Sequence, residues 1–560
     1  MKFLRSAAAA HQPRGLSSFC SSQKKRGRIL IGGQKFRQDS SAFLFTTPMM
    51  EKQKTQYPKN VFSTKAAPSP SSAQSFDTET IYKHKTSCEL FSAYSILRAC
   101  RIDSLTKLGP AILENADRLG VASPVYWGLK KTFFSHFCGG ESVDDPQLHK
   151  NIARLNQMGI GAILDYSVEA HSGADSGASS SEAPYDRTVN VIAKTIELTA
   201  AKDKLNNYKS NGFSCVKMTA LCHPELLLRM SQLIAHSPSA TTTFELGIPS
   251  SFSSPPPSLA ERPSPYVFSS VAKYSKYLPG MPGLPPTVVP LPQPLSREEQ
   301  EQLKRLVARL DKLCSESSQR GVPFLIDAEQ TYFQPAVDYL ALEMMAKYNR
   351  GKCVVYNTYQ LYLKDAESRF RIDADFARKG SWQHASKIVR GAYMNSERER
   401  IRRGKATDTT GSPALPDPFH PNIAETHRAY DATVTYILDN VADMATVVAS
   451  HNKNSIACAS AAMKQKNLVA SSNPSCPPSS PMTPRERISF AQLYGMADYL
   501  TMDLANMGFR VCKYLPFGPI QEVMPYLTRR LEENKDMMGQ APFEVGLISK
   551  ELTSRLFGRH

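Results

Sequence analysis

The sequence predicts an α/β fold, a (βα)8 barrel that follows a helical N-terminal region. Short apolar runs, several of them rich in β-branched residues, alternate with segments of helical periodicity, as strands buried on both faces should. This alternation implies parallel pairing, and eight repeats favour a closed barrel over an open doubly wound sheet. The eight expected strands are residues 159–167, 213–221, 322–329, 353–359, 386–393, 444–452, 488–495 and 510–518.

The first 75 of the 560 residues differ in composition from the rest of the chain. The opening 50 residues contain nine Lys or Arg and a single acid, Asp39, and are rich in Ser and Ala. This composition is typical of a mitochondrial transit peptide, and the uninterrupted apolar stretch of a secretory signal is missing. We therefore expect residues 1–75 to be a disordered transit peptide and linker. A disordered basic tail of another kind is the alternative.

The net charge of +17 does not by itself predict nucleic-acid binding, because nearly half of the excess lies in this leader. The eleven cysteines include no CxxC pair, so neither a disulfide framework nor a zinc site is expected. Scattered free cysteines are consistent with a reducing compartment such as the mitochondrial matrix. No apolar stretch approaches about 18 residues, so we expect no membrane-spanning helix, while peripheral membrane contact stays open.

Helical periodicity dominates residues 76–158, which we expect to form an N-terminal helical region ahead of a barrel spanning 159–550. Three stretches within the barrel are poor in core-forming residues and rich in Ser, Pro or Gly, so we interpret them as surface insertions. They are residues 171–184, about 236–296 and 470–484, of which the middle one is long and rich in proline.

Polar residues stand at the ends of the expected strands, where the active sites of such barrels lie. Any one of them fits a structural ion pair equally well, but a ring of them at matching positions favours a functional site. No HExxH, GxxxxGK[ST] or strand-ending GxGxxG pattern accompanies the ring. Asp327 and Glu329 could form the acid/base pair of a glycosidase. We expect them to point to opposite faces of a strand, so that at most one faces the barrel interior, and this disfavours the pair.

The segment QEVMPYLTRRLEEN, residues 521–534, lies near the C-terminus. Tyr526, Arg529, Arg530 and Glu533 occur at i, i+3, i+4 and i+7 and therefore share one helix face. Alone, this cluster is either a solvated face or an anion-binding device. Two guanidinium groups suit a carboxylate, since each presents paired and directed hydrogen bonds.

Seven motifs together identify a resemblance. FLIDAEQTYFQPAVDYLALEMM, VVYNTYQLYLKDA, KIVRGAYMNSERER, SHN, QLYGMADYL, KYLPFGP and YLTRRLEEN occur in this order on successive expected strands and the last helix. They closely resemble the proline dehydrogenase family over about residues 85–550. The resemblance implies a distorted (βα)8 barrel, bound FAD, hydride transfer from C5 of L-proline to FAD N5, and Δ1-pyrroline-5-carboxylate as product. It also implies ubiquinone as the electron acceptor and peripheral contact with the inner mitochondrial membrane from the matrix side.

The resemblance also assigns substrate-side roles. An arginine pair, assisted by a lysine, binds the carboxylate, while a tyrosine and a leucine pack on the proline ring. An aspartate and a second tyrosine lie beside substrate and flavin. The residues that match are Lys217, Asp327, Tyr393, Leu493, Tyr514, Arg529 and Arg530. From its position one turn after the pair, we also expect Glu533 to hold one of the arginines in place.

For FAD, the resemblance implies contacts from the fourth, fifth and sixth strands. Asn357 and Lys387 stand where bacterial members have Gln and Arg, so an amide and a cation are kept. The residues that match the flavin-contacting positions are Asn357, Lys387, Arg390, Gly391, Ala392, Ser450, His451 and Asn452.

Two other functions remain open at this point. A hydroxyproline dehydrogenase is disfavoured, because a 4-hydroxyl group would crowd Tyr514. A catalytically inactive barrel that acts as a binding protein is disfavoured by the intact arginines, lysines and Asp327. The sequence identifies no base for the substrate amine.

Overall fold

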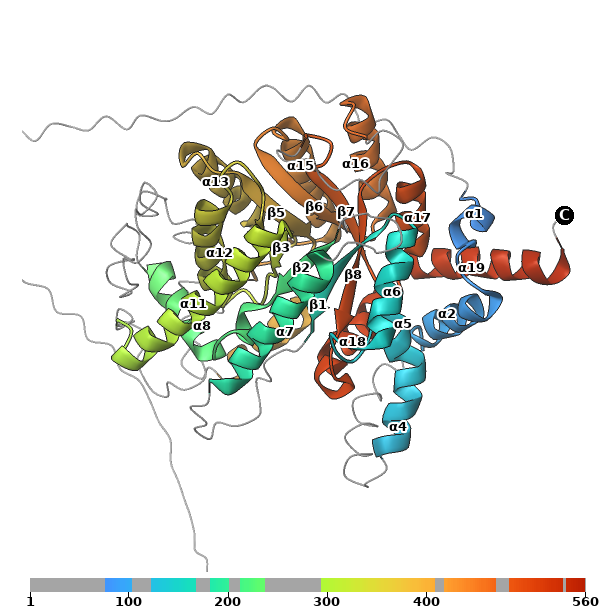
Figure 1. Ribbon diagram of the computed structural model, residues 1–560, viewed down its shortest axis with the longest axis horizontal. Helices are drawn as coiled ribbons and strands as arrows, with labels where there is room; N and C mark the ends of the chain where they lie inside the picture. The colour runs from blue at the N-terminus through green and yellow to red at the C-terminus, as the bar shows by residue number, and fades with distance from the viewer. Residues whose placement is uncertain are drawn as a thin grey trace, which may run out of the picture. The chain divides into compact units, whose positions relative to one another are not determined.

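The computed structural model describes residues 76–102, 122–167, 182–200, 212–236, 294–407, 417–469, 483–536 and 540–558. The expected leader and linker, and nearly all of the three expected insertions, lie outside the described residues. Within the described part, eight parallel strands close into a barrel in chain order, as the sequence predicts (Figure 1). The strands are β1 (Gly161–Tyr166), β2 (Phe213–Val216), β3 (Phe324–Ile326), β4 (Val355–Gln360), β5 (His384–Val389), β6 (Met444–Ala449), β7 (Ile488–Leu493) and β8 (Val511–Phe517).

The strands bury both faces, which explains their nearly continuous apolar composition. Inward side chains such as Ile163, Phe213 and Leu325 fill the barrel interior in one cluster. Alternate side chains such as Leu164 and Phe324 instead pack outward against the helices. Because side chains alternate along a strand, residue parity decides which ones reach the interior.

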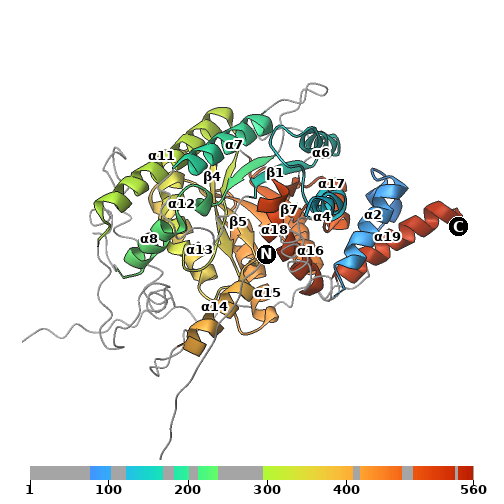
Figure 2. The same cartoon turned by 90° about the horizontal axis from the view of Figure 1, so that it is seen from below.

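The helices of the barrel surround the strands (Figure 2). Local signals fix several of their ends. The helix α11 begins with a capping box of Ser296 and Glu299 and ends at Gly321, whose φ of 65° is left-handed. The barrel helices are α7 (Ala183–Ala200), η2 (Met218–Ala220), α8 (Pro224–His236), α11 (Arg297–Arg320), α12 (Gln334–Tyr348), α13 (Ala366–Lys379), α14 (Met394–Thr407), α15 (Ile423–Asp439), α16 (Lys453–Gln465), α17 (Asp498–Asn506) and α18 (Ile520–Asp536).

The N-terminal region is helical in its described part, as predicted, and the C-terminal helix α19 (Gln540–Phe557) packs against it. Arg555 of α19 donates hydrogen bonds to the backbone carbonyls of Lys85 (2.7 Å) and Tyr82 (2.9 Å). The sequence predicts a barrel that continues to residue 550, whereas α19 packs mainly beside the N-terminal helices α1 and α2. These are α1 (Thr78–Tyr82), α2 (Ser87–Ala99), α4 (Ala122–Leu129), η1 (Lys130–Phe134), α5 (Ser135–Phe137) and α6 (Pro146–Gln157).

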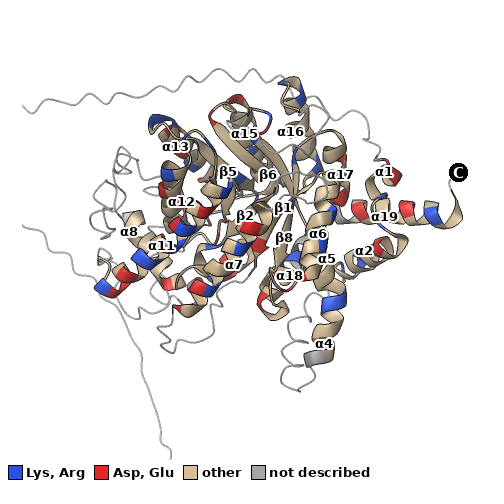
Figure 3. Ribbon diagram, viewed as in Figure 1, with Lys and Arg blue, Asp and Glu red and all other residues tan. Residues whose placement is uncertain are grey.

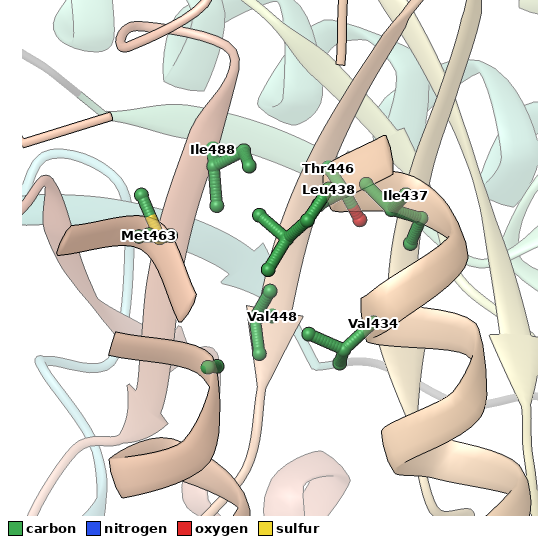
Figure 4. A pocket seen from close by; sticks show the side chains of 8 residues that line it. Val434, Ile437, Leu438, Thr446, Val448, Met463 and Ile488 are labelled. Atoms are coloured by element: carbon green, nitrogen blue, oxygen red, sulfur yellow. The ribbon is translucent and has the colours of Figure 1, made fainter. Parts of the chain in front are cut away.

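Acidic and basic residues both occur on outer helices such as α7, α11 and α13 (Figure 3). Among the described residues, no helix combines the length and the apolar character that crossing a membrane requires. An apolar pocket lies outside the barrel wall, between α15, α16 and the strands β6 and β7 (Figure 4). Val434, Val448, Met463 and Ile488 are among the apolar residues that line it, together with Thr446.

Candidate active site

A row of alternating acids and ammonium groups lines one end of the barrel. Parallel strands present their carboxyl ends together, so Asp165 of β1, Lys217 after β2, Asp327 after β3 and Lys387 of β5 meet there. Lys217 Nζ lies 3.1 Å from Asp165 Oδ1 and 3.9 Å from Asp327 Oδ2. Lys387 Nζ donates to the other oxygen of Asp327. All four side chains are buried, so each charge depends on its neighbours for compensation.

Tyr514 of β8 completes the row. Its hydroxyl donates to Asp327 Oδ2 at 2.7 Å, and the ammonium group of Lys387 lies 5.0 Å from its ring centroid. Burial, together with the charges of Asp165 and Asp327, raises the pKa of Tyr514 well above its ordinary value, so the phenol stays protonated. Asp327 is therefore held by Lys387 on one oxygen and by Tyr514 on the other.

Asp165 fixes the lysine at the other end of the row. Its carboxylate accepts hydrogen bonds from Lys217 at 3.1 and 3.2 Å and from the hydroxyl of Ser167. Burial alone would raise the pKa of Asp165. The charge of Lys217 and these hydrogen bonds outweigh burial, and the pKa is lowered. Asp165 is thus a buried anion that holds Lys217 in place.

The same region contains three potential metal ligands, Asp165, Cys215 and Asp327, whose ligand atoms lie within 4.8 Å of one another. The donor set does not fit a cation. Lys217 and Lys387 already pair with the two carboxylates. Burial and the neighbouring acids raise the pKa of the Cys215 thiol well above its ordinary value, so a thiolate ligand is disfavoured.

The helix α18 crosses the mouth of the barrel. On one side, Tyr526 and Leu527 share a hydrophobic cluster with Leu493 of β7 and Tyr514 of β8. On the other side, the guanidinium carbon of Arg529 lies 5.3 Å from the ring centroid of Tyr393, which follows β5. Since β5 and β8 are separated by two strands in the closed barrel, these contacts span the opening.

Arg529 and Arg530 lie on adjacent positions of α18 and stack on different rings. Arg530 is buried, with its guanidinium carbon 4.8 Å from the ring centroid of Tyr526. Stacking fixes the planes of both guanidinium groups while leaving their edges suited to hydrogen bonds. The side chain of Glu533, the expected brace of this pair, lies outside the part that the structure describes.

The ends of β5 and β6 hold the next predicted group. Arg390 donates to the hydroxyls of Ser450 (2.7 Å) and Ser455 (2.9 Å). Its guanidinium carbon also lies 4.4 Å from the ring centroid of Tyr430. Asn452 caps α16 by accepting from the Ser455 backbone amide at 3.0 Å.

The remaining predicted residues of this edge lie beside Arg390. His451 Nε2 accepts from the Leu493 backbone amide at 2.9 Å, and burial lowers the pKa of this histidine to about 3, so it is neutral. Gly391 has a φ of 139°, and a Cβ there would lie 2.0 Å from the Tyr362 ring, so this position needs glycine. Ala392 is exposed.

Asn357 does not join the mouth, contrary to its expected role beside the flavin. Its side chain points outward from β4 and donates to Asp338 of α12 at 2.9 Å, within a buried network that includes Arg369. The reason is parity, because Tyr356 faces the barrel interior and Asn357 must face away. By the same parity the amide of Gln360 lies on the inner row, where it donates to the Glu329 carbonyl at 2.8 Å.

Gln360 is therefore a candidate that motif matching missed. Counting alternate residues from the apolar Tyr356 would have found it. The expectation that Asp327 and Glu329 point to opposite faces of a strand is wrong, because residues two apart on a strand share a face, and both residues lie beyond β3. They nevertheless have different partners, since the Glu329 carboxylate accepts from the backbone amide (3.0 Å) and the hydroxyl of Thr219.

Comparisons with known proteins agree with the resemblance. Residues 148–541 match the family model described as proline dehydrogenase. "Proline dehydrogenase 1, mitochondrial" of Dictyostelium discoideum is 33% identical over 488 residues, which cover 86% of this chain and 75% of that protein. A "hydroxyproline dehydrogenase" of Xenopus laevis is 28% identical, covering 89% of this chain and 93% of that protein.

A solved structure shares the fold. The crystal structure of proline utilization A (PutA) from Bdellovibrio bacteriovorus inactivated by N-propargylglycine superposes with a TM-score of 0.51 at 17% identity. The match covers 86% of this chain but only 41% of the bacterial protein. At this identity the comparison supports the barrel fold alone.

We predict that Asp165→Asn lowers the free energy of unfolding at neutral pH by about 3 kcal/mol, because Lys217 keeps a buried charge without its nearest partner. Chemical unfolding of both proteins measures the difference. Asp144→Asn is the matched control, since Asp144 pairs with Lys194 on the surface, and it should change the free energy by less than about 1 kcal/mol.

The pH dependence of this difference has a definite sign. The pKa of Asp165 is lowered below its ordinary 3.8, so its stabilisation is present above that pH and is lost as pH falls through the lower, folded-state value. The two proteins should therefore become more alike in stability below pH 3.8. A difference that grows on acidification would contradict the ionised assignment.

Proposed function

The chain belongs to the proline dehydrogenase family, and we propose that it oxidises L-proline to Δ1-pyrroline-5-carboxylate, the first step of proline catabolism to glutamate. The observation that supports this most directly is the arginine pair on α18, which lies at a mouth lined by Tyr514 and Leu493. Such a site suits a ligand that carries a carboxylate, an amine and an apolar ring. We further propose ubiquinone as acceptor and peripheral contact with the matrix side of the inner mitochondrial membrane.

FAD is the cofactor that we propose. The chemistry of the donors at the ends of β5 and β6 fits a group with an anionic diphosphate and a polar ring. Lys387 supplies a buried cation, Arg390 a partly exposed one, and Ser450 a hydroxyl. Gln360 joins them in place of Asn357, with Gly391, Ala392, His451 and Asn452 at the same edge. When bound, FAD N5 would accept the hydride that leaves C5 of proline.

The protein's own contribution is positioning and charge compensation. Arg529, Arg530 and Lys217 would bind the proline carboxylate, and Tyr514 and Leu493 would hold its ring. Asp327 is fixed between Lys387 and Tyr514, so it can face the substrate amine as a rigid anion. Tyr393 supports Arg529, and α18 covers the mouth and excludes water. Glu533 remains part of the proposed arginine support.

An anaerobic titration tests the function as a whole. Purified protein should show a flavin absorption spectrum that L-proline bleaches, together with proline-dependent dye reduction. Under the same conditions 4-hydroxyproline should be a poorer substrate in kcat/KM, because its hydroxyl would crowd Tyr514. Protein without bound flavin, or a preference for hydroxyproline, would overturn the proposal.

We expect Arg529→Met or Arg530→Met to raise the KM for proline strongly while flavin stays bound. Loss of a charged hydrogen-bonding partner costs about 2–4 kcal/mol, or roughly 30- to 1000-fold. Steady-state kinetics and the flavin spectrum measure both effects. Arg378→Met, on the exposed part of α13, is the control, and loss of flavin from either α18 variant would show that the pair is wrongly assigned.

Variants of the two side-chain amides of β4, Gln360 and Asn357, should distinguish a role in cofactor binding from a role in stability. Gln360→Ala should reduce the bound flavin, because Gln360 lies on the inner row. Asn357→Ala should retain flavin and lower the free energy of unfolding by about 1–3 kcal/mol, because Asp338 loses a buried donor. Flavin content per protein and chemical unfolding test this, and the opposite pattern would restore Asn357 as the flavin contact.

A further inference from the structure

A second cluster of paired charges lies just outside the barrel wall, at the turn between β7 and α17. Asp498, the first residue of α17, accepts from Lys513 of β8 at 2.7 Å and from Lys85, which lies between α1 and α2. Glu544 of α19 is also buried beside them. The cluster thus joins one strand, one barrel helix, the N-terminal region and the C-terminal helix.

Glu544 supplies a cap that α17 lacks. Ala497, the N-cap residue, has a left-handed φ of 50° and no side-chain hydrogen bond to the helix. The two carboxylate oxygens of Glu544 accept from the backbone amides of Ala497 (2.9 Å) and Asp498 (3.0 Å). A carboxylate at a helix N-terminus also interacts favourably with the helix dipole. Glu544, which is 47 positions away from Ala497 in the sequence, therefore caps the N-terminus of α17.

Other contacts hold the remaining backbone of the turn. Lys513 Nζ donates to the carbonyls of Leu493 (3.2 Å) and Met496 (2.6 Å). Gly495 has a φ of 77°, and a Cβ there would lie 2.2 Å from the carbonyl oxygen of His136 in α5. The turn is consequently packed from β8, from the N-terminal helices and from α19 at once.

The opposite face of this turn belongs to the candidate site. Leu493 opens the turn and packs with Tyr514 and Tyr526 at the mouth. Lys513 and Tyr514 are neighbours on β8, so one points outward into the charge cluster and the other inward to the mouth. A displacement of the turn would move Leu493 directly. Lys85 and Glu544 both lie outside the residues that the family model matches, 148–541.

We propose that Glu544 and Lys85 are positioning residues, through which the flanking segments fix the β7–α17 turn and thereby the Leu493 wall of the substrate pocket. The inference about the pocket rests on the proposed proline oxidation. The inference about the turn does not, because it concerns only amides and carboxylates of the chain.

The experiment compares Glu544→Ala and Glu544→Gln with the wild-type full-length flavoprotein, using two measurements. Amide hydrogen exchange of the peptide that contains Ala497 and Asp498 reports the cap. Loss of one helix cap should accelerate this exchange by about 3- to 30-fold in Glu544→Ala. The KM for proline should rise by about 3- to 30-fold as well, with kcat changed less than about twofold.

Matched variants separate positioning from general damage. Glu544→Gln keeps the shape and one acceptor oxygen, so its exchange and KM should be intermediate, and it carries the test if Glu544→Ala does not fold. Lys85→Met should move KM in the same direction. Lys550→Gln, on the exposed face of the same helix, should change neither measurement.

Two outcomes would overturn the proposal. Unchanged exchange in both Glu544 variants would show that Glu544 does not hold the turn. Faster exchange with an unchanged KM would show that the turn does not position the pocket. A wild-type protein that fails to oxidise proline would refute the proposed function instead, and the exchange data would still decide whether Glu544 holds the turn.

Discussion

The row of two carboxylates and two ammonium groups at the barrel mouth is the interaction on which the rest of the site depends. Asp165, Lys217, Asp327 and Lys387 are buried, and a buried charge is tolerated only beside a compensating one. Their formal charges sum to zero. An anionic ligand that enters this mouth therefore finds directed donors but no surplus positive charge in the row itself. The compensating charge for a substrate carboxylate has to come from elsewhere.

In the proposed function the arginines of α18 supply it, which would account for the position of α18 across the opening. Arg529 stacks on Tyr393, which follows β5, while Tyr526 and Leu527 of α18 pack with Leu493 and Tyr514. The helix therefore contacts the barrel at both sides of the mouth, and the Arg530–Tyr526 stack lies within the helix itself. In the proposed function, the helix that covers the mouth therefore also carries the residues that bind the carboxylate. If additional positive groups stood on the strands themselves, they would repel Lys217 and Lys387 whenever no ligand is bound. Positive groups on the covering helix can lie farther from these lysines, which makes this repulsion smaller.

The strands were predictable from the sequence because a parallel barrel imposes a local signature, the apolar run followed by a helical period. Once the strands are located, the polar residues at their carboxyl ends can be identified from the sequence as well. Asn357 shows where motif matching fails: a displacement by an odd number of residues along a strand reverses the face, and only counting from Tyr356 identifies Gln360. The position of α19 was beyond prediction, because the partners of Glu544 are two backbone amides of a distant turn. Every residue except proline has a backbone amide, so the sequence does not show which amides a distant carboxylate binds.

The row at the barrel mouth and the charge cluster at the β7–α17 turn both compensate buried charges by pairing them. Each contains two ammonium groups that pair with one aspartate, and β8 contributes to both through consecutive residues, Lys513 outward and Tyr514 inward. A chain limited to residues 148–541 would lack Lys85 and Glu544. Asp498 would keep Lys513, but the first amides of α17 would lose their acceptor, and an uncapped helix start frays. Because that helix start continues the turn after Leu493, the flanking helices belong to the architecture of the pocket as much as the barrel does.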